Sequence, residues 1–162
     1  MFSAQSTSPN VSIIEAEAID WEPLFTIYKD EDLPVDLEKA MAHVQWDFAQ
    51  IGKDRKIWYA VIEGMRIGSL QLVFDHQQKD LANGKDTAYL HHFRIAKMHQ
   101  GKGIGSLLVK HAEHEAKKHG FTIMTLEVEK LNSKAQQIYE HLGYAYFRES
   151  SNLVEIAMKK AL

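Results

Sequence analysis

The stretch that decides the fold runs from residue 89 to residue 120 and reads YLHHFRIAKMHQGKGIGSLLVKHAEHEAKKHG. It opens with aromatic and β-branched residues over 89–95, which favours a strand. Its second half predicts an amphipathic helix, because apolar residues recur at three- and four-residue steps and form one stripe: Ile104, Leu107, Leu108, Ala112 and Ala116. Gly120 follows a Lys-Lys-His run, which suits a helix C-terminus, where cations and a left-handed glycine are favoured.

A glycine-rich loop, Gln-Gly-Lys-Gly-Ile-Gly-Ser over residues 100–106, joins the predicted strand to the predicted helix. The first N–H groups of a helix have no partner within the helix, and they lie at the positive end of its dipole. Glycines remove the Cβ atoms that would keep a phosphate away from these N–H groups. The loop therefore predicts a phosphate-binding site.

Two familiar phosphate-binding patterns do not fit this loop. A P-loop, G-x-x-x-x-G-K-[ST], needs a glycine five residues before Gly101 or Gly103, and neither position has one. A dinucleotide-binding G-x-G-x-x-G needs a glycine where Ser106 or Leu108 stands. The pattern that remains is Q-x-x-G-x-G, preceded on the strand by Phe-x-Ile.

This pattern, made by Gln100, Gly103 and Gly105, resembles the acetyl-CoA-binding motif [RQ]-x-x-G-x-[GA] of the GCN5-related N-acetyltransferase (GNAT) superfamily. A second signature of that superfamily, N-x-x-A-x-x-x-Y-x-x-x-G-[FY], follows a predicted strand and is matched with every spacing kept by Asn132, Ala135, Tyr139, Gly143 and Tyr144. One glycine-rich turn is a weak signal, but two motifs in the right order are a strong one. The resemblance covers roughly residues 55–147, and the first fifty residues carry no motif.

The order of predicted elements also resembles the GNAT topology. Periodicity and turn signals predict helices after Asp20, over Val35–Gln50, from Ile104 and over Ser133–His141, and strands over Val11–Ala18, Ile57–Ile62, Arg66–Phe74, Tyr89–Ile95, Thr122–Glu129, Tyr144–Glu149 and Leu153–Lys159. The resulting order is β-α-α-β-β-β-α-β-α-β-β. The resemblance implies an α/β (α+β) fold with a central mixed, mostly antiparallel twisted sheet of about seven strands flanked by about four helices.

Composition bounds the other expectations. A chain of 162 residues, 45% hydrophobic and 25% charged, predicts one domain over residues 1–162, with residues 1–10 as a disordered lead-in. A net charge of −3 gives no reason to expect nucleic-acid or membrane binding, and no apolar run is long enough to span a membrane. The absence of cysteine favours a reducing cytoplasm.

The resemblance implies acetyl-CoA as co-substrate and a set of residues that hold it. The cofactor diphosphate would bind the main-chain N–H groups of Gln100, Gly101, Lys102, Gly103, Ile104, Gly105 and Ser106, with the Lys102 side chain adding charge. The main-chain groups of Phe93 and Ile95 would pair with the pantetheine arm, because a bulge splays this strand from its neighbour in the family. Asn132 would contact the cofactor or cap its helix. The alternative is a plain strand-to-helix turn.

Two side chains are candidates for proton transfer. By resemblance, Tyr139 is the general acid for the leaving thiolate; the alternative is a core tyrosine whose hydroxyl finds a partner. The general base is less constrained. Before any bulge, His91 shares a strand face with Tyr89, Phe93 and Ile95, it matches a histidine of the arylalkylamine branch, and its ordinary pKa of about 6.5 suits the role. The alternatives are a structural histidine, or a base at His92, Glu127 or a water molecule.

No metal is expected. His111 and His114 on the predicted helix are three residues apart, whereas a helical metal pair needs four, so a solvated face is the better interpretation. The amine acceptor would be selected by the N-terminal helices, the acidic run at residues 30–32 and the loop over residues 75–86. Four aromatic residues could line its pocket or belong to the core: Trp21, Tyr28, Trp46 and Trp58.

The leading hypothesis is an N-acetyltransferase that moves acetyl from acetyl-CoA to a primary amine of a small molecule or peptide, by direct attack in a ternary complex. The second is a catalytically silent acyl-CoA-binding module. The third is a nucleotide-binding protein that shares only the turn. Dimers are common in the family, so the resemblance leaves a homodimer open, together with the identity of the amine acceptor.

Overall fold

The structure, a computed structural model, describes residues 10–29 and 36–162, apart from the side chains of residues 28 and 29. Residues 1–9 of the lead-in expected over residues 1–10 lie outside the described part, and so does the acidic run at residues 30–32. So does the side chain of Tyr28. Among the described residues, no helix is long and apolar enough to cross a membrane.

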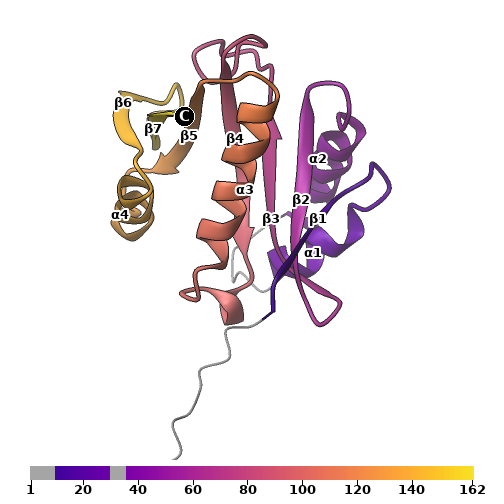
Figure 1. Cartoon of the computed structure of the whole chain (residues 1–162). Coiled ribbons are helices and arrows are strands. Elements are labelled where there is room, and N and C mark those ends of the chain that lie inside the picture. Colours follow the sequence, from indigo (N-terminus) through magenta and orange to yellow (C-terminus); the bar gives the residue numbers. More distant parts are fainter. Residues whose placement is uncertain (1–9, 30–35) are drawn as a thin grey trace, which may run out of the picture.

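The strands form one mixed sheet, in the order β1-β2-β3-β4-β5-β7-β6 (Figure 1). All neighbouring strands are antiparallel except β4 and β5, which are parallel. Their bounds are β1 Ser12–Glu15, β2 Arg55–Ile62, β3 Met65–Val73, β4 Thr87–Ile95, β5 Ile123–Glu129, β6 Ala145–Glu149 and β7 Glu155–Ala161. The seven strands and the β-α-α-β-β-β-α-β-α-β-β order confirm the predicted fold class and topology.

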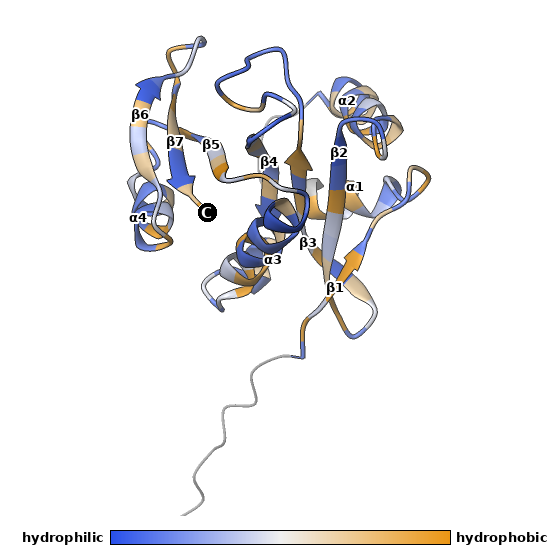
Figure 2. Cartoon of the chain, turned by 45° about the horizontal axis from the view of Figure 1, so that its top comes forward, coloured by the Kyte–Doolittle hydropathy of each residue, from blue (hydrophilic) through white to orange (hydrophobic). Residues whose placement is uncertain are grey.

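The helices cover both faces of the sheet. They are α1 (Glu22–Lys29), α2 (Leu37–Ala49), α3 (Ile104–Lys118) and α4 (Ser133–His141), with a short 3₁₀ helix at Lys97–His99 that the sequence did not predict. Alternation along β2 separates two cores: Trp58 and Ala60 pack with α3, whereas Ile57 and Tyr59 pack with α1 and α2. Figure 2 shows mostly hydrophilic residues along the visible side of α3, as expected of a helix that covers a sheet.

Two predicted boundaries shift for identifiable reasons. The helix expected from Val35 begins at Leu37, because Asp36 caps it by accepting a hydrogen bond from the Lys39 N–H group. The first strand ends at Glu15 instead of Ala18. The Glu63-Gly64 hairpin turn is confirmed, and both residues have positive φ, 48° and 77°, as a tight hairpin requires.

The apolar stripe of α3 is rotated relative to the prediction. Ile104, Leu108, Ala112 and Ala116 are buried, but Leu107 is 49% exposed and Val109 is buried in its place. Periodicity locates the apolar side of a helix only approximately, and packing against the sheet decides which flanking residue turns inward.

β4 leaves β5 halfway along its length. The two strands pair from Thr87–Ile123 to Leu90–Leu126; beyond this point β4 continues beside β3, and β5 continues beside β7. A bulge accompanies the separation: Ser69 and Gln71 of β3 face Arg94 and His91, so a single β3 residue opposes two residues of β4. The splayed strand implied by the family resemblance is therefore present.

The bulge changes the side to which the β4 side chains point. His92 has φ of 45°, a left-handed conformation that is uncommon for a residue with a side chain. As a result, Phe93 and Ile95 pack with the α3 core, while His91 and His92 both line a cavity on the opposite face. The predicted face, with His91, Phe93 and Ile95 together and His92 opposite, is wrong because the extra residue resets the alternation.

Candidate functional site

The glycine-rich loop is held open by its own geometry. Gly101 and Gly103 adopt left-handed φ angles of 74° and 79°, and space is open beside both. The Gln100 side chain donates a hydrogen bond of 2.9 Å to the carbonyl of Ile95, which ties the loop to the end of β4. Gln100 therefore positions the loop with its side chain, a role that the motif alone did not reveal.

The main-chain donors of this loop meet the requirement for an anion site. In the described part of the chain, the first backbone hydrogen bond of α3 runs from Leu107 N–H to the Gly103 carbonyl, at 3.2 Å, and the N–H groups of residues 101–106 donate to no backbone carbonyl. They lie at the positive end of a 15-residue helix. The exposed Lys102 adds a cation at the rim, and the buried Ile104 anchors the turn in the core.

Gly105 serves close packing. A Cβ atom at this position would lie 2.7 Å from Cζ of Phe93, so only glycine lets the start of α3 approach β4. Phe93 is thereby wedged between α3 and Tyr139. The side chains of Phe93 and Ile95 belong to the core, as predicted, and the Ile95 carbonyl already accepts the hydrogen bond from Gln100.

A second hollow lies between α3 and α4, next to the loop. It has a volume of about 300 Å³ and is lined by Ser106, Lys134, Gln137, Ile138, His141 and Leu142. Asn132 caps α4: its Oδ1 accepts a hydrogen bond of 3.0 Å from the Ala135 N–H group. The structure thus assigns Asn132 the capping role that was the alternative to a cofactor contact.

Tyr139 lies on α4 with its ring against the splayed part of β4. The ring packs edge-on against Phe93 and Tyr144, with centroid separations of 6.4 and 6.1 Å. Its hydroxyl makes no hydrogen bond to the described residues, and burial raises the pKa of the phenol to about 12. At neutral pH the phenol therefore keeps its proton and can donate it.

A much larger cavity, of about 1150 Å³, opens on the other face of β4. It is lined by one side of α2, the start of β2, the segment after β3 and the β4 bulge, including Trp46, His43, His76, His91, His92 and Arg94. Trp46 is 56% exposed at this cavity, whereas Trp58 lies in the α3 core and Trp21 packs in the α1–α2 core. Of the suggested aromatic residues whose side chains the structure describes, only Trp46 lines this cavity.

His91 is partly buried and lines this cavity. Its Nδ1 atom lies 3.2 Å from the Tyr89 hydroxyl, and that hydroxyl is 3.2 Å from Oε1 of Glu127 on β5. Burial, together with the neighbouring basic groups His92 and Arg55, holds the pKa of His91 well below its ordinary value. His91 is therefore neutral at pH 7, with one ring nitrogen free to accept a proton.

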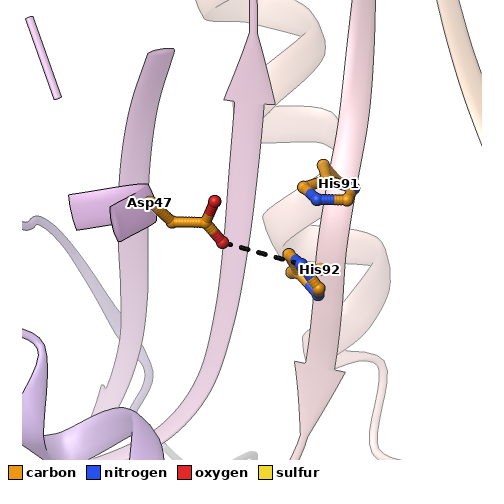
Figure 3. A group of neighbouring side chains, drawn as sticks. All are labelled: Asp47, His91 and His92. Atoms are coloured by element: carbon orange, nitrogen blue, oxygen red, sulfur yellow. Dashed lines mark ion pairs between the residues drawn. The ribbon is translucent and has the colours of Figure 1, made fainter. Parts of the chain in front are cut away.

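His92 and Asp47 complete the cluster drawn in Figure 3, in which Asp47 points from α2 towards the two histidines of β4. The two imidazole rings lie 3.8 Å apart between centroids, and His92 Nε2 is 3.6 Å from Asp47 Oδ2. Burial lowers the pKa of His92, and the charge of Asp47 opposes this shift. Two histidines and a carboxylate are also a ligand set for a transition metal.

A buried ion pair already occupies the carboxylate of this cluster. Arg55 Nη1 donates to Asp47 Oδ1 at 2.9 Å, and Gln71 Nε2 donates to Asp47 Oδ2 at 3.0 Å. The guanidinium would stand directly behind any cation bound at Asp47, so these contacts fit an ordered cavity wall better than a metal centre. The sequence reasoning missed this network, although an acid between Val44 and Phe48 on the apolar side of α2 was a possible signal.

The predicted residues therefore fall into two groups. The loop donors and Tyr139 lie with α3 and α4, whereas His91 and His92 lie on the α2 side of β4. Both groups adjoin the point where β4 leaves β5: His91 follows the last paired residue, Leu90, and Tyr139 packs on Phe93.

Known proteins resemble this chain in sequence and in fold. Residues 21–144 match the Acetyltransferase (GNAT) family. A streptothricin acetyltransferase of Streptomyces lavendulae is 38% identical over 52 residues, which are 32% of this chain and only 28% of that enzyme. The structure is similar to that of the PaiA N-acetyltransferase from Thermoplasma acidophilum in complex with coenzyme A, with a TM-score of 0.75, 18% identity, and coverage of 94% of this chain and 99% of that one.

A second solved structure, yncA from Salmonella typhimurium with its cofactor acetyl-CoA, gives a TM-score of 0.72 at 18% identity and covers 94% of both chains. At such low identity the structural matches establish the fold, and the family rests on the sequence match over residues 21–144. That match extends over most of the chain and includes both motifs. This chain belongs to the acetyltransferase (GNAT) family.

Proposed function

We propose that this protein is an N-acetyltransferase that moves the acetyl group of acetyl-CoA to a primary amine, by direct attack in a ternary complex. The observation that carries the proposal is the arrangement around the β4–β5 separation. A loop of free main-chain donors lies on one side of β4, and a cavity of about 1150 Å³ lined by the neutral imidazole of His91 lies on the other. A thioester held at the separation would be accessible to an amine in that cavity.

The residues present fit acetyl-CoA. The donors of residues 101–106 suit a diphosphate, because they are free and lie beside glycines with left-handed φ and open space. The edge of β4 that β5 abandons after Leu90 suits the amide groups of a pantetheine arm, in the manner of an added strand. When bound, acetyl-CoA would supply an acetyl group already activated as a thioester.

The side chains then divide the proton transfers. The neutral imidazole of His91 takes the proton of the attacking amine, and it is available because its low pKa leaves the ring unprotonated. Tyr139 donates its phenolic proton to the departing sulfur, because the phenol is protonated at neutral pH and its hydroxyl has no hydrogen-bond partner among the described residues. Trp46 and the cavity wall would orient the amine, and orientation alone accounts for a large part of such a rate enhancement.

The test is a panel of amines, including polyamines, aminoglycosides, amino acids and peptides, scored by release of the free CoA thiol. Turnover with an amine, lost in His91→Gln, supports the proposal. A catalytically silent acyl-CoA-binding module predicts instead that acetyl-CoA raises the unfolding temperature while no amine is acetylated. Stabilisation by ATP or NAD without any by acetyl-CoA would favour a nucleotide-binding protein and overturn the proposal.

A further inference from the structure

His91 is one end of a line of four hydrogen-bonded side chains. The line runs from His91 to Tyr89 on the same strand, then to Glu127 on β5, and then to Ser150 after β6. The first two contacts are 3.2 Å each, and the Ser150 hydroxyl donates to the second carboxylate oxygen of Glu127. Tyr89 and Ser150 are buried, with exposed fractions of 4% and 2%. Tyr89, Glu127 and Ser150 play no part in the mechanism above.

The protons along this line can be assigned by counting donors. An ionised carboxylate only accepts hydrogen bonds, so Tyr89 must use its single hydroxyl proton on Glu127. Burial and the charge of Glu127 raise the pKa of the Tyr89 phenol, so the hydroxyl keeps this proton. The Tyr89 oxygen can then only accept from His91, which requires the hydrogen of the neutral imidazole to be on Nδ1.

We infer that Tyr89 and Glu127 are positioning residues that lock His91 in the Nδ1–H tautomer and leave Nε2 as the proton acceptor presented to the cavity. The tautomer follows from the hydrogen bonds alone; its catalytic consequence rests on the proposed function. A carboxylate that fixes a histidine in this way is known to matter greatly in other enzymes, where the wrong tautomer abolishes most of the rate.

The same contacts remove Glu127 as an alternative base. Both of its oxygens are engaged, one by Tyr89 and the other by Ser150. Glu127 is also not among the residues that line the cavity of about 1150 Å³, whereas His91 is. Its role is therefore to hold the base in place.

Other charged groups surround His91 and determine its charge. The groups near it come from α2, β2, the segment after β3 and β4 itself: Asp47, Arg55, His76, His92 and Arg94. Four of these are basic and disfavour an imidazolium, as burial does, while Asp47 contacts His92. The neutral ring therefore persists below pH 6.5, and its tautomer is the property that the Tyr89 contact controls.

The first measurement needs no substrate. In protein labelled with ¹⁵N-histidine, long-range ¹H–¹⁵N correlation spectra distinguish the protonated ring nitrogen from the bare one. Wild-type His91 should show the proton on Nδ1 at pH 7. Tyr89→Phe removes the acceptor while keeping the ring, so the Nδ1–H form should lose its predominance. Wild-type His91 with its proton on Nε2, or an unchanged tautomer in Tyr89→Phe, would overturn the inference.

Glu127→Gln gives a second and opposite prediction. A glutamine can donate its amide to the Tyr89 oxygen, which frees the Tyr89 hydroxyl to donate to His91 Nδ1. The ring should then switch to the Nε2–H form. The matched control for the spectra is Tyr144→Phe, because Tyr144 also donates to a buried carboxylate, Glu113, at 2.9 Å, but in the α3 core. This control should leave the His91 signals unchanged.

Kinetics with an accepted amine separate positioning from structure. Glu127→Gln should lower kcat about 100-fold, the lower end of what a positioned general base contributes, with the KM for acetyl-CoA unchanged. Tyr89→Phe should lose less, since it leaves both tautomers populated. A switched tautomer with an unchanged kcat would overturn the positioning role. A wild-type protein that acetylates no amine would overturn the proposed function, while the spectra would still decide the tautomer.

Discussion

The two carboxylates on Arg55 provide a direct measure of what burial adds to an ion pair. Arg55 Nη1 donates to Asp47 at 2.9 Å, and Arg55 Nε donates to Asp54 at 2.8 Å. The Asp47 side chain is 6% exposed and the Asp54 side chain 30%, while the Arg55 side chain they share is 4% exposed. Replacing each acid by alanine removes the same kind of contact from two environments.

The expected losses differ severalfold. Asp47→Ala leaves a buried guanidinium partly uncompensated and deprives Gln71 of its acceptor, so the free energy of unfolding should fall by about 3–5 kcal/mol. Asp54→Ala removes a partner that water can replace, so the loss should be below about 1 kcal/mol. For a chain of this size these values correspond to a fall in Tm of about 6–20 °C and less than about 4 °C.

Urea unfolding followed by circular dichroism, with linear extrapolation to water, gives both free energies. A double variant, Asp47→Leu with Arg55→Met, tests the reasoning further, because replacing both charges with apolar groups should restore much of the loss. Equal losses for the two single variants would refute the argument that burial sets the difference. So would a double variant no more stable than Asp47→Ala.

Three further outcomes follow from the site. Tyr139→Phe should lower kcat at least about 10-fold while calorimetry shows unchanged acetyl-CoA affinity; an unchanged kcat would exclude the phenol from proton transfer. Gly103→Asp should abolish acetyl-CoA binding, because it adds backbone strain and a like charge at the donor loop. Gly105→Asp should also abolish binding, because its side chain would in addition displace Phe93. Retained affinity in both variants would contradict the loop assignment. The free energy of unfolding should fall as the pH drops below about 6.5, by up to about 1.4 kcal/mol per pH unit from His91. Its lowered pKa keeps the ring neutral in the folded protein while the unfolded chain takes up the proton, so His91→Gln should flatten this slope.

The sequence was sufficient for the order of elements and for the glycine-rich loop between β4 and α3. These depend on local signals: periodicity, turn residues and glycines with fixed spacing. Local reasoning is less decisive for polar residues at helix starts. Asp36 and Asn132 both cap their helices, α2 and α4, although Asn132 was also a candidate cofactor contact.

The features that sequence reasoning missed depend on distant parts of the chain. The family resemblance implied a bulge in β4, but its position, which brings His92 to the same face as His91, arises from the pairing of β4 with β3, and nothing in the local sequence marks it. The Asp47–Gln71 contact joins residues 24 positions apart, and the Tyr89–Glu127 contact joins residues 38 positions apart. Such polar contacts have no periodicity to signal them, although they decide the protonation and orientation of the candidate base.

The separation of β4 from β5 has a mechanical consequence. Strands β1–β4 and β5–β7 form two parts of the sheet, and within the described residues their strand backbones pair only at four positions, from Thr87–Ile123 to Leu90–Leu126. Because this paired stretch is short, the two parts should move relative to each other more easily than either part bends internally. A molecule that hydrogen-bonds to the free edge of β4 and also contacts α4 would connect the two parts of the sheet, so that its binding stiffens both parts together.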